Sequence, residues 1–253
     1  MPVVLRGACR VVGVREGLPT ERDGLRVWRH VGRESGATFV SLRVLELEPR
    51  ATAGLRNGDC EEVLFVLEGS GRVFIDGWPW PVAPETGVFV RPGAALALTN
   101  PGPGPLTLLS SQCPDPGPAL LVEKPLTSPR AGVTPPPPPL ARLWEREARP
   151  AGDRWYRVLL DESAGSTQAT QFVGAIPPGR APNHFHEYEE VLCVLAGSGR
   201  MWADDMNAPV GPGSCVFLPR RQVHCTENTG ASELRLVGVF APAGSPAVSY
   251  SAG

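Results

Sequence analysis

The stretch EEVLFVLEGSGR, from Glu61 to Arg72, returns as EEVLCVLAGSGR from Glu189 to Arg200, with ten of twelve positions identical. The same offset of 128 residues, without a gap, pairs Val88-Phe89 with Val216-Phe217 and Asn100 with Asn228. A repeat period of this length indicates two copies of a whole domain, because solenoid repeats are much shorter.

The composition around these repeats favours β-structure. The chain of 253 residues contains 29 glycines and 29 prolines, and short runs of Val, Leu and Phe separate them. This pattern is typical of short strands joined by tight turns. The clearest helical periodicity is a short piece from Pro139 to Glu147. We therefore predict an all-β protein.

The repeat and a proline-rich segment suggest the domain limits. We predict a first domain over residues 1–115, a linker over 116–140 that ends in five consecutive prolines, and a second domain over 141–253. Consecutive prolines favour a stiff polyproline II conformation, so the linker is interpreted as a spacer.

Three of the four histidines lie close together in the second half. His184 and His186 are two positions apart, Glu190 follows, and His224 comes after a turn-rich stretch. Alternate residues of a strand face the same side, so His184 and His186 can point into one cavity. Imidazole and carboxylate ligands suit a divalent transition metal (Fe, Mn, Ni, Co, Cu or Zn) better than Ca or Mg. With an ordinary histidine pKa, we expect metal occupancy to fall below about pH 6.

The first half lacks this set of residues. At the offset of 128, His184 corresponds to Arg56, His186 to Gly58 and His224 to Leu96, and only Glu190 has a counterpart, Glu62. One carboxylate cannot bind a transition metal tightly. We expect a metal-free first domain with a structural role.

These residues resemble the cupin superfamily, and the duplication resembles a bicupin. The first cupin motif is matched from Gly179 through the histidine pair and Glu190 to Gly197, with four residues instead of five after Gly179. The second motif is matched by Gly213, Pro219, His224 and Asn228, while Arg221 stands where the family has glycine. The resemblance implies two tandem antiparallel barrels of jelly-roll type. It also implies that His184, His186, Glu190 and His224 bind the metal inside the second barrel.

The resemblance also supplies three functional hypotheses. The leading one is a metal-dependent, dioxygenase-type oxidoreductase that acts on a small organic molecule. The second is an isomerase, decarboxylase or hydrolase that uses the metal as a Lewis acid. The third is a cupin that binds a metal or a small molecule without catalysis. The substrate and the catalytic residues stay unassigned.

Several residues near the motifs are candidates for the pocket wall. They are Phe172, Trp202, Phe217, Gln171 and Arg157. Glu189, beside Glu190, faces the opposite way and is interpreted as a solvent-exposed or supporting carboxylate.

The remaining composition limits the partners. The net charge of −2 and the lack of a long basic run argue against nucleic acid and anionic membranes. No apolar run is long enough to span a bilayer, and the first ten residues do not resemble a signal peptide. Six widely spaced cysteines suit buried thiols in a reducing compartment. We expect a cytoplasmic protein, and the family suggests a homodimer.

Overall fold

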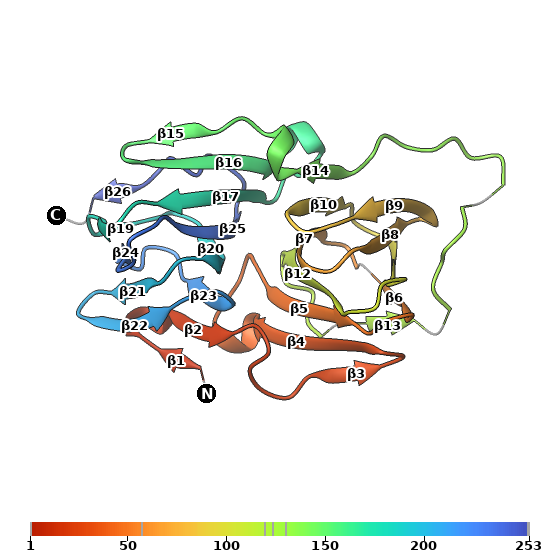
Figure 1. Ribbon diagram of the computed structural model, residues 1–253, viewed down its shortest axis with the longest axis horizontal. Coiled ribbons are helices and arrows are strands. Elements are labelled where there is room, and N and C mark those ends of the chain that lie inside the picture. The colour runs from red at the N-terminus through yellow and green to blue at the C-terminus, as the bar shows by residue number, and fades with distance from the viewer. Residues whose placement is uncertain (1, 57, 119, 123, 130, 252–253) are drawn as a thin grey trace.

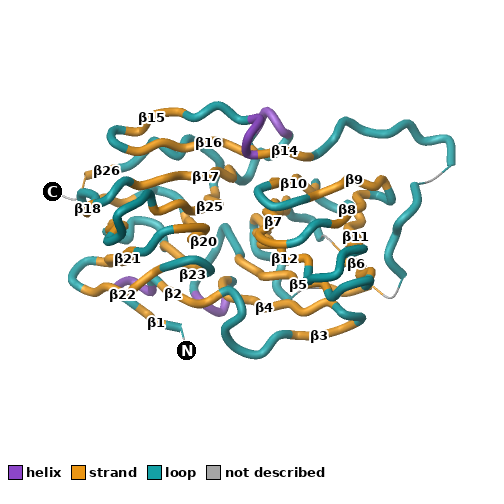
Figure 2. Tube along the Cα trace, viewed as in Figure 1, coloured by secondary structure: helices purple, strands orange, loops and turns teal. Residues whose placement is uncertain are grey.

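The computed structural model describes residues 2–251 except 57, 119, 123 and 130, and strands dominate it (Figure 1). Figure 2 shows how little helix there is. Within the described residues the helical segments are four 3₁₀ turns: η1 (Arg6–Ala8), η2 (Arg33–Ser35), η3 (Leu143–Glu145) and η4 (Glu162–Ala164). The predicted all-β class is confirmed. The helix expected over Pro139 to Glu147 is wrong, because a strand and the short η3 turn occupy that segment.

Two antiparallel sheets form the first barrel, at the right of Figure 1. The larger sheet has the order β14-β10-β7-β12-β5-β4-β3. Its strands are β3 (Thr20–Arg22), β4 (Leu25–Val31), β5 (Leu42–Leu47), β7 (Glu61–Glu68), β10 (Thr86–Val90), β12 (Leu106–Cys113) and β14 (Leu140–Arg142). The smaller sheet, in the order β13-β6-β11-β8-β9, consists of β6 (Thr52–Arg56), β8 (Gly71–Ile75), β9 (Trp78–Val82), β11 (Ala95–Thr99) and β13 (Leu120–Val122).

The second barrel, at the left of Figure 1, repeats this plan. Its larger sheet has the order β1-β2-β23-β20-β25-β17-β16-β15. The strands are β1 (Val3–Val4), β2 (Arg10–Gly13), β15 (Arg149–Ala151), β16 (Arg154–Leu160), β17 (Thr170–Ile176), β20 (Glu189–Ala196), β23 (Ser214–Leu218) and β25 (Leu234–Ala241). The smaller sheet, in the order β22-β21-β24-β19-β26 with β18 also paired to β24, consists of β18 (Gly179–Arg180), β19 (His184–Phe185), β21 (Gly199–Ala203), β22 (Met206–Val210), β24 (His224–Asn228) and β26 (Tyr250–Ser251).

The strand limits reproduce the sequence repeat. Strands β7, β8, β9, β10 and β12 correspond to β20, β21, β22, β23 and β25 with both ends shifted by 128 residues. Strands β3 and β4 correspond to β15 and β16 with a shift of 129. The gap-free repeat therefore misplaces the earlier strands of each half by one residue.

Each half of the chain contributes one strand to a sheet of the other barrel. Strand β2, near the N-terminus, pairs with β23 of the second barrel, and β14 pairs with β10 of the first. Since β10 and β23 correspond, the exchange is reciprocal. The domain limits at residues 115 and 141 stay a prediction, and residues 119, 123 and 130 of the expected linker lie outside the described part.

The repeated strands are buried on both faces. In β7, Val63 and Phe65 join an apolar cluster that lies between the two barrels, whereas Leu64 and Val66 face the interior of the first barrel. Strand β20 alternates in the same way between that shared cluster and the interior of the second barrel. A continuous apolar run is the expected sequence of a strand buried on both sides.

The outward-facing glutamates of these strands accept hydrogen bonds from backbone N–H groups of the opposite half. Glu189 accepts backbone N–H groups of Thr38 and Phe39 at 2.9 and 2.7 Å. Its counterpart Glu61 accepts the backbone N–H groups of Thr167 and Gln168 at 3.0 and 2.9 Å. Burial alone would raise the pKa of Glu61, but these hydrogen bonds hold it below its usual value. Glu189 is buried, so its interpretation as a solvent-exposed carboxylate is wrong, and the group that it supports is a loop of the opposite half.

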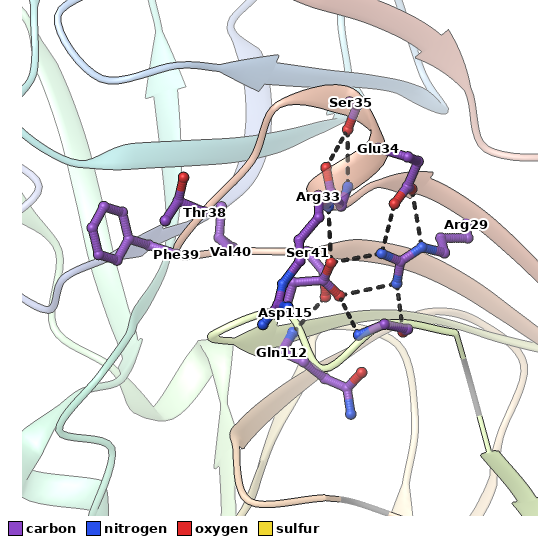
Figure 3. Close-up of polar contacts among 12 residues, drawn as sticks. Arg29, Arg33, Glu34, Ser35, Thr38, Phe39, Val40, Ser41, Gln112 and Asp115 are labelled. Atoms are coloured by element: carbon purple, nitrogen blue, oxygen red, sulfur yellow. Dashed lines mark hydrogen bonds and ion pairs between the residues drawn. The ribbon is translucent and has the colours of Figure 1, made fainter.

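The loop that is hydrogen-bonded to Glu189 is itself held in place within the first barrel. The buried carboxylate of Asp115 binds the Arg29 guanidinium at 2.6 Å and the backbone N–H of Arg33 at 2.9 Å. Figure 3 shows this network on one side of the loop, with Thr38 and Phe39 on the other side. The loop therefore presents its N–H groups to Glu189 from a fixed position.

Two equivalent glycines explain why the repeated strands end alike. Gly69 and Gly197 have φ values of 80° and 84°, a region that favours glycine. A Cβ atom on Gly69 would lie 2.3 Å from the carbonyl oxygen of Pro105. Both the backbone conformation and the close approach require glycine here.

Within the described residues, no helix is long and apolar enough to cross a membrane.

Replacing Glu189 with alanine should remove the acceptor from buried N–H groups of the opposite half. Since each unsatisfied buried donor costs about 1–3 kcal/mol, we expect the free energy of unfolding to fall by about 3 kcal/mol in urea denaturation. Glu187→Ala is the control, because water screens the ion pairs of Glu187 with Arg220 and Arg221, so their loss changes stability little. An equal fall in the free energy of unfolding of the two variants would contradict a stabilising role for the hydrogen bonds of Glu189.

Candidate metal centre

Two short strands and the turn after one of them bring the three histidines together. His184 on β19 lies directly opposite His224 on β24 in the strand pairing, and His186 follows β19. Ring centroids lie 4.5 Å apart for His184 and His224, and 5.1 Å apart for His186 and His224. One ring nitrogen of each histidine lies within 4.8 Å of the others. This spacing could hold a metal ion between them.

Backbone carbonyls fix the orientation of all three rings. The Nδ1 atom of His184 lies 3.0 Å from the oxygen of Pro182, and that of His224 lies 2.8 Å from the oxygen of Gln222. The Nδ1 atom of His186 lies 3.0 Å from the oxygen of Val248. A carbonyl oxygen only accepts, so each Nδ1 carries the proton and each Nε2 keeps its lone pair free. This is the arrangement usual for metal-binding histidines.

Burial keeps these imidazoles neutral. It lowers the pKa of His186 to about 4 and that of His224 to about 3, and the neighbouring His184 adds to both effects. Burial also lowers the pKa of His184, against its hydrogen bond with Pro182, and the charge of Arg154 lowers it further. Neutral imidazole is the form that binds metal. Metal occupancy is therefore expected to fall at a lower pH than an ordinary histidine pKa predicts.

Glu190 reaches the same space from β20. One carboxylate oxygen lies 3.9 Å from Nε2 of His186, although the carboxylate stands outside the close group of three ring nitrogens. Burial raises the pKa of Glu190 to about 8, so without a cation beside it the group is mostly protonated at pH 7.

The histidines open on a cavity of about 490 Å³ inside the second barrel. This volume lies within the range of sites for small organic molecules. Its aromatic wall consists of Trp155, Tyr156, Phe172 and Tyr188. The Tyr188 ring also stacks on His186, with centroids 4.5 Å apart and planes 10° apart.

The last described residues form another wall of this cavity. Strand β26 pairs with β19, and Tyr250 stacks on Phe185 with ring centroids 5.4 Å apart. Pro246 and Ser249 line the cavity, and Val248 supplies the carbonyl that orients His186. The sequence motifs gave no sign of this segment, because it lies outside both motifs and orients His186 through a backbone carbonyl.

Three of the predicted pocket residues lie on β17 and β23, and one of them lines the cavity. Phe172 is part of its wall. Gln171, one position earlier on β17, faces the first barrel and donates to the carbonyl oxygen of Leu64 at 3.2 Å. Phe217 belongs to the apolar cluster between the barrels. The prediction for Gln171 and Phe217 is corrected accordingly.

The other two predicted pocket residues also point elsewhere. The Trp202 indole donates to Glu227 at 2.8 Å and lies 4.0 Å from the Arg180 guanidinium, away from the cavity lining. Arg157 donates to the carbonyl oxygen of Leu143 at 3.1 Å. Trp202 lies on β21 and Arg157 on β16, and the side chains of both face away from the cavity, so these two predictions are also corrected.

Sequence reasoning missed Tyr188 and Arg154 as cavity residues. Tyr188 lies two positions from both His186 and Glu190, so strand periodicity could have indicated it. Arg154 lies outside the histidine motifs, and no comparable signal marks it.

The family's glycine position is occupied by Arg221 with a φ of 61°, so the turn before His224 keeps the left-handed conformation without glycine. Its backbone N–H donates to the carbonyl oxygen of His186 at 2.8 Å.

The first barrel has leucines where the second has His184 and His224. Leu55 lies opposite Leu96 in the strand pairing, as His184 lies opposite His224. The sequence offset matched His184 with Arg56, one position away from this structural counterpart. Both leucines are buried in the interior cluster of the first barrel.

The one retained carboxylate of the first barrel has an internal cation. Arg43 binds Glu62 at 2.7 Å, and the Ser110 hydroxyl donates to the same carboxylate at 2.6 Å. Among the described residues, the one group of three or more potential ligands close enough for a metal is the histidine cluster of the second barrel.

Comparisons with known proteins agree with this architecture. Residues 172–240 match the model of the cupin domain. A variant of Bacillus subtilis oxalate decarboxylase superposes with a TM-score of 0.75 at 14% identity, over 95% of this chain and 78% of that one. A structure of the same enzyme, from work on its Mn(II) centres, gives a TM-score of 0.76 at 15% identity over the same shares. Likeness at this identity concerns the fold.

One curated protein is similar in sequence. Protein SchB of Streptomyces halstedii is 34% identical over 87 residues, which cover 34% of this chain. The match spans 63% of the length of that protein.

The raised pKa of Glu190 predicts a pH-dependent stability in chelator-treated protein. An unfolded-state pKa of 4.5 and a folded-state pKa of about 8 mean that the folded protein holds the extra proton. Its stabilising effect is complete below pH 4.5 and is lost as the pH rises through 8. The free energy of unfolding, measured relative to Glu190→Gln, should therefore fall by about 1.4 kcal/mol per pH unit between pH 5.5 and 7.5.

The comparison with Glu190→Gln cancels the titration of the histidines, which both proteins share. Glu187→Gln is the control, because the exposed Glu187 has a lowered pKa and is ionised in both states over this range. A constant difference between wild type and Glu190→Gln would show that Glu190 is ionised in the folded protein.

Proposed function

We propose that this chain, a member of the cupin superfamily with bicupin architecture, is a metal-dependent enzyme acting on a small organic molecule. In this proposal His184, His186, His224 and Glu190 bind one divalent transition-metal ion in the second barrel. The observation that carries it is the convergence of three neutral imidazoles, each with Nδ1 hydrogen-bonded to a backbone carbonyl, at the wall of a cavity of about 490 Å³.

The donor set fits such an ion. Three Nε2 lone pairs and a nearby carboxylate match Fe, Mn, Ni, Co, Cu or Zn, and they provide too few oxygens for Ca or Mg. Four protein ligands leave coordination positions free, as in catalytic rather than structural sites. The described part of the first barrel offers the lone carboxylate of Glu62, already bound to Arg43, so we place one metal in the second barrel.

The residues of the chain prepare the site in three ways. Backbone carbonyls hold the imidazole rings, and burial keeps them unprotonated. Tyr188 and Phe172 cover apolar surface of the cavity and reduce access of water. A metal bound there supplies a Lewis acid for a substrate oxygen and, for a redox-active ion, a site for O₂.

For the reaction we propose a dioxygenase-type oxidation of an enol, phenol or keto acid. A second candidate is decarboxylation without net O₂ consumption, and the fold shared with oxalate decarboxylase favours it. Binding of a small molecule without turnover is the remaining alternative, and the assays below distinguish the three.

Elemental analysis of the purified protein should find about one equivalent of a transition metal per chain. His186→Ala should lose that metal, because it removes one of three imidazole ligands and typically weakens binding by orders of magnitude. His30→Ala is the matched control, since His30 is bound to the carbonyl oxygen of Val14 far from the cluster. Protein that stays metal-free after reconstitution would overturn the proposal.

The reaction class is tested by O₂ electrode and CO₂ measurements with a panel of catechols, flavonols and keto acids, together with oxalate. We expect O₂ uptake by the metal-loaded protein and its loss in His186→Ala. Release of CO₂ without O₂ uptake would select the decarboxylase. Saturable binding with no product would select the non-catalytic alternative.

A further inference from the structure

One cationic side chain lines the cavity of the second barrel. Among the described lining residues Arg154 is the single arginine or lysine, and Asp153 and Glu190 are the carboxyl groups. Arg154 is the first residue of β16, and its side chain is 26% exposed. It stands where the cavity meets solvent.

The guanidinium of Arg154 is largely free to bind a ligand. Its ion-pair partner is Asp153, whose oxygen lies 3.8 Å from Nε and whose side chain is 78% exposed. Within the described part of the chain it makes no hydrogen bond. Arg157 on the same strand differs, because it donates to the carbonyl oxygen of Leu143.

The charge of Arg154 acts on the metal-binding end of the cavity. It contributes to the lowered pKa values of His184 and His224, although burial is the main cause. The Asp153 carboxylate beside Arg154 is 78% exposed and screened by water, whereas the Arg154 side chain is 26% exposed, so the guanidinium is the charged group that a ligand inside the cavity meets.

The aromatic lining and the volume of the cavity indicate the size and polarity of the rest of the ligand. Trp155, Tyr156, Phe172 and Tyr188 provide aromatic surface, and the cavity volume of about 490 Å³ suits a molecule of one or two rings. A cation at one end of an aromatic cavity is complementary to an organic anion with a flat apolar body.

We propose that Arg154 binds the acidic group of the substrate, and that the substrate class is an aromatic carboxylate. The inference rests on the proposed function for the existence of a substrate, but the binding itself can be measured without a metal. Arg154 then sets specificity: it selects the anion and orients its body toward the histidines.

The test compares 1-naphthoate with 1-naphthamide, which has the same shape and no charge. Binding is followed by titration calorimetry with the metal-free protein and with the zinc-loaded protein at pH 7. We expect the wild type to bind the carboxylate about tenfold or more tightly than the amide, as a charge-assisted hydrogen bond provides. Arg154→Gln should abolish this preference, and Arg154→Lys should restore part of it.

Arg180→Gln is the matched control, because Arg180 stacks on Trp202 outside the cavity lining and its loss should leave the preference unchanged. Zinc content and thermal unfolding of Arg154→Gln show whether that variant keeps its fold and metal site. Equal binding of the two probes by the wild type, binding of neither, or a preference that survives in Arg154→Gln would each overturn the inference. Failure of the wild type to take up any metal counts against the proposed function alone, since the metal-free titration still decides the role of Arg154.

Discussion

Glu61 and Glu189 each accept hydrogen bonds from backbone N–H groups of the opposite half, and the arrangement of the two barrels depends on these bonds. Each glutamate begins a strand whose next residue, Glu62 or Glu190, points into a barrel. Because strand side chains alternate, a carboxylate anchored on one face fixes the direction of its neighbour on the other. The backbone amides that hold Glu189 therefore also aim Glu190 at the histidines. The histidine-lined end of the second barrel thus depends on a loop of the first barrel, which gives the first half a structural role in the candidate site.

The two barrels show how one framework supports two different interiors. Both retain the inward glutamate, but a buried carboxylate needs a compensating cation or a proton. In the first barrel Arg43 supplies the cation, and Leu55 and Leu96 fill the space that histidines occupy in the second. In the second barrel the corresponding space stays open as a cavity, and the glutamate keeps a proton until a cation arrives. An internal arginine and the proposed metal are thus alternative solutions to the same buried charge.

The sequence predicted the repeat, the β-class and the residues that the histidine cluster brings together, because these leave periodic or spaced signals. It could not predict which face of a strand a residue such as Phe217 or Gln171 would present. Both faces of the larger sheets are buried, so the usual contrast of apolar inside and polar outside is missing. The single-residue shift between the early and late strands of the repeat likewise displaced His184 from its true counterpart, Leu55. The wall formed by Pro246 to Ser251 lies outside both motifs, and it orients His186 through the backbone carbonyl of Val248, for which no residue type is diagnostic.

Burial links the two proposed binding events in the cavity. When a divalent ion displaces the proton from Glu190, the charge of the site rises by about one unit rather than two, and Arg154 already contributes a positive charge nearby. An organic anion offsets both charges in a region where few waters screen them. In the proposed function, metal and anion would therefore stabilise each other's binding, and by linkage the effect would be mutual, because the anion would tighten metal binding as much as the metal would tighten anion binding. In this proposal, the charges of the cavity are balanced only when both the metal and the anion are bound.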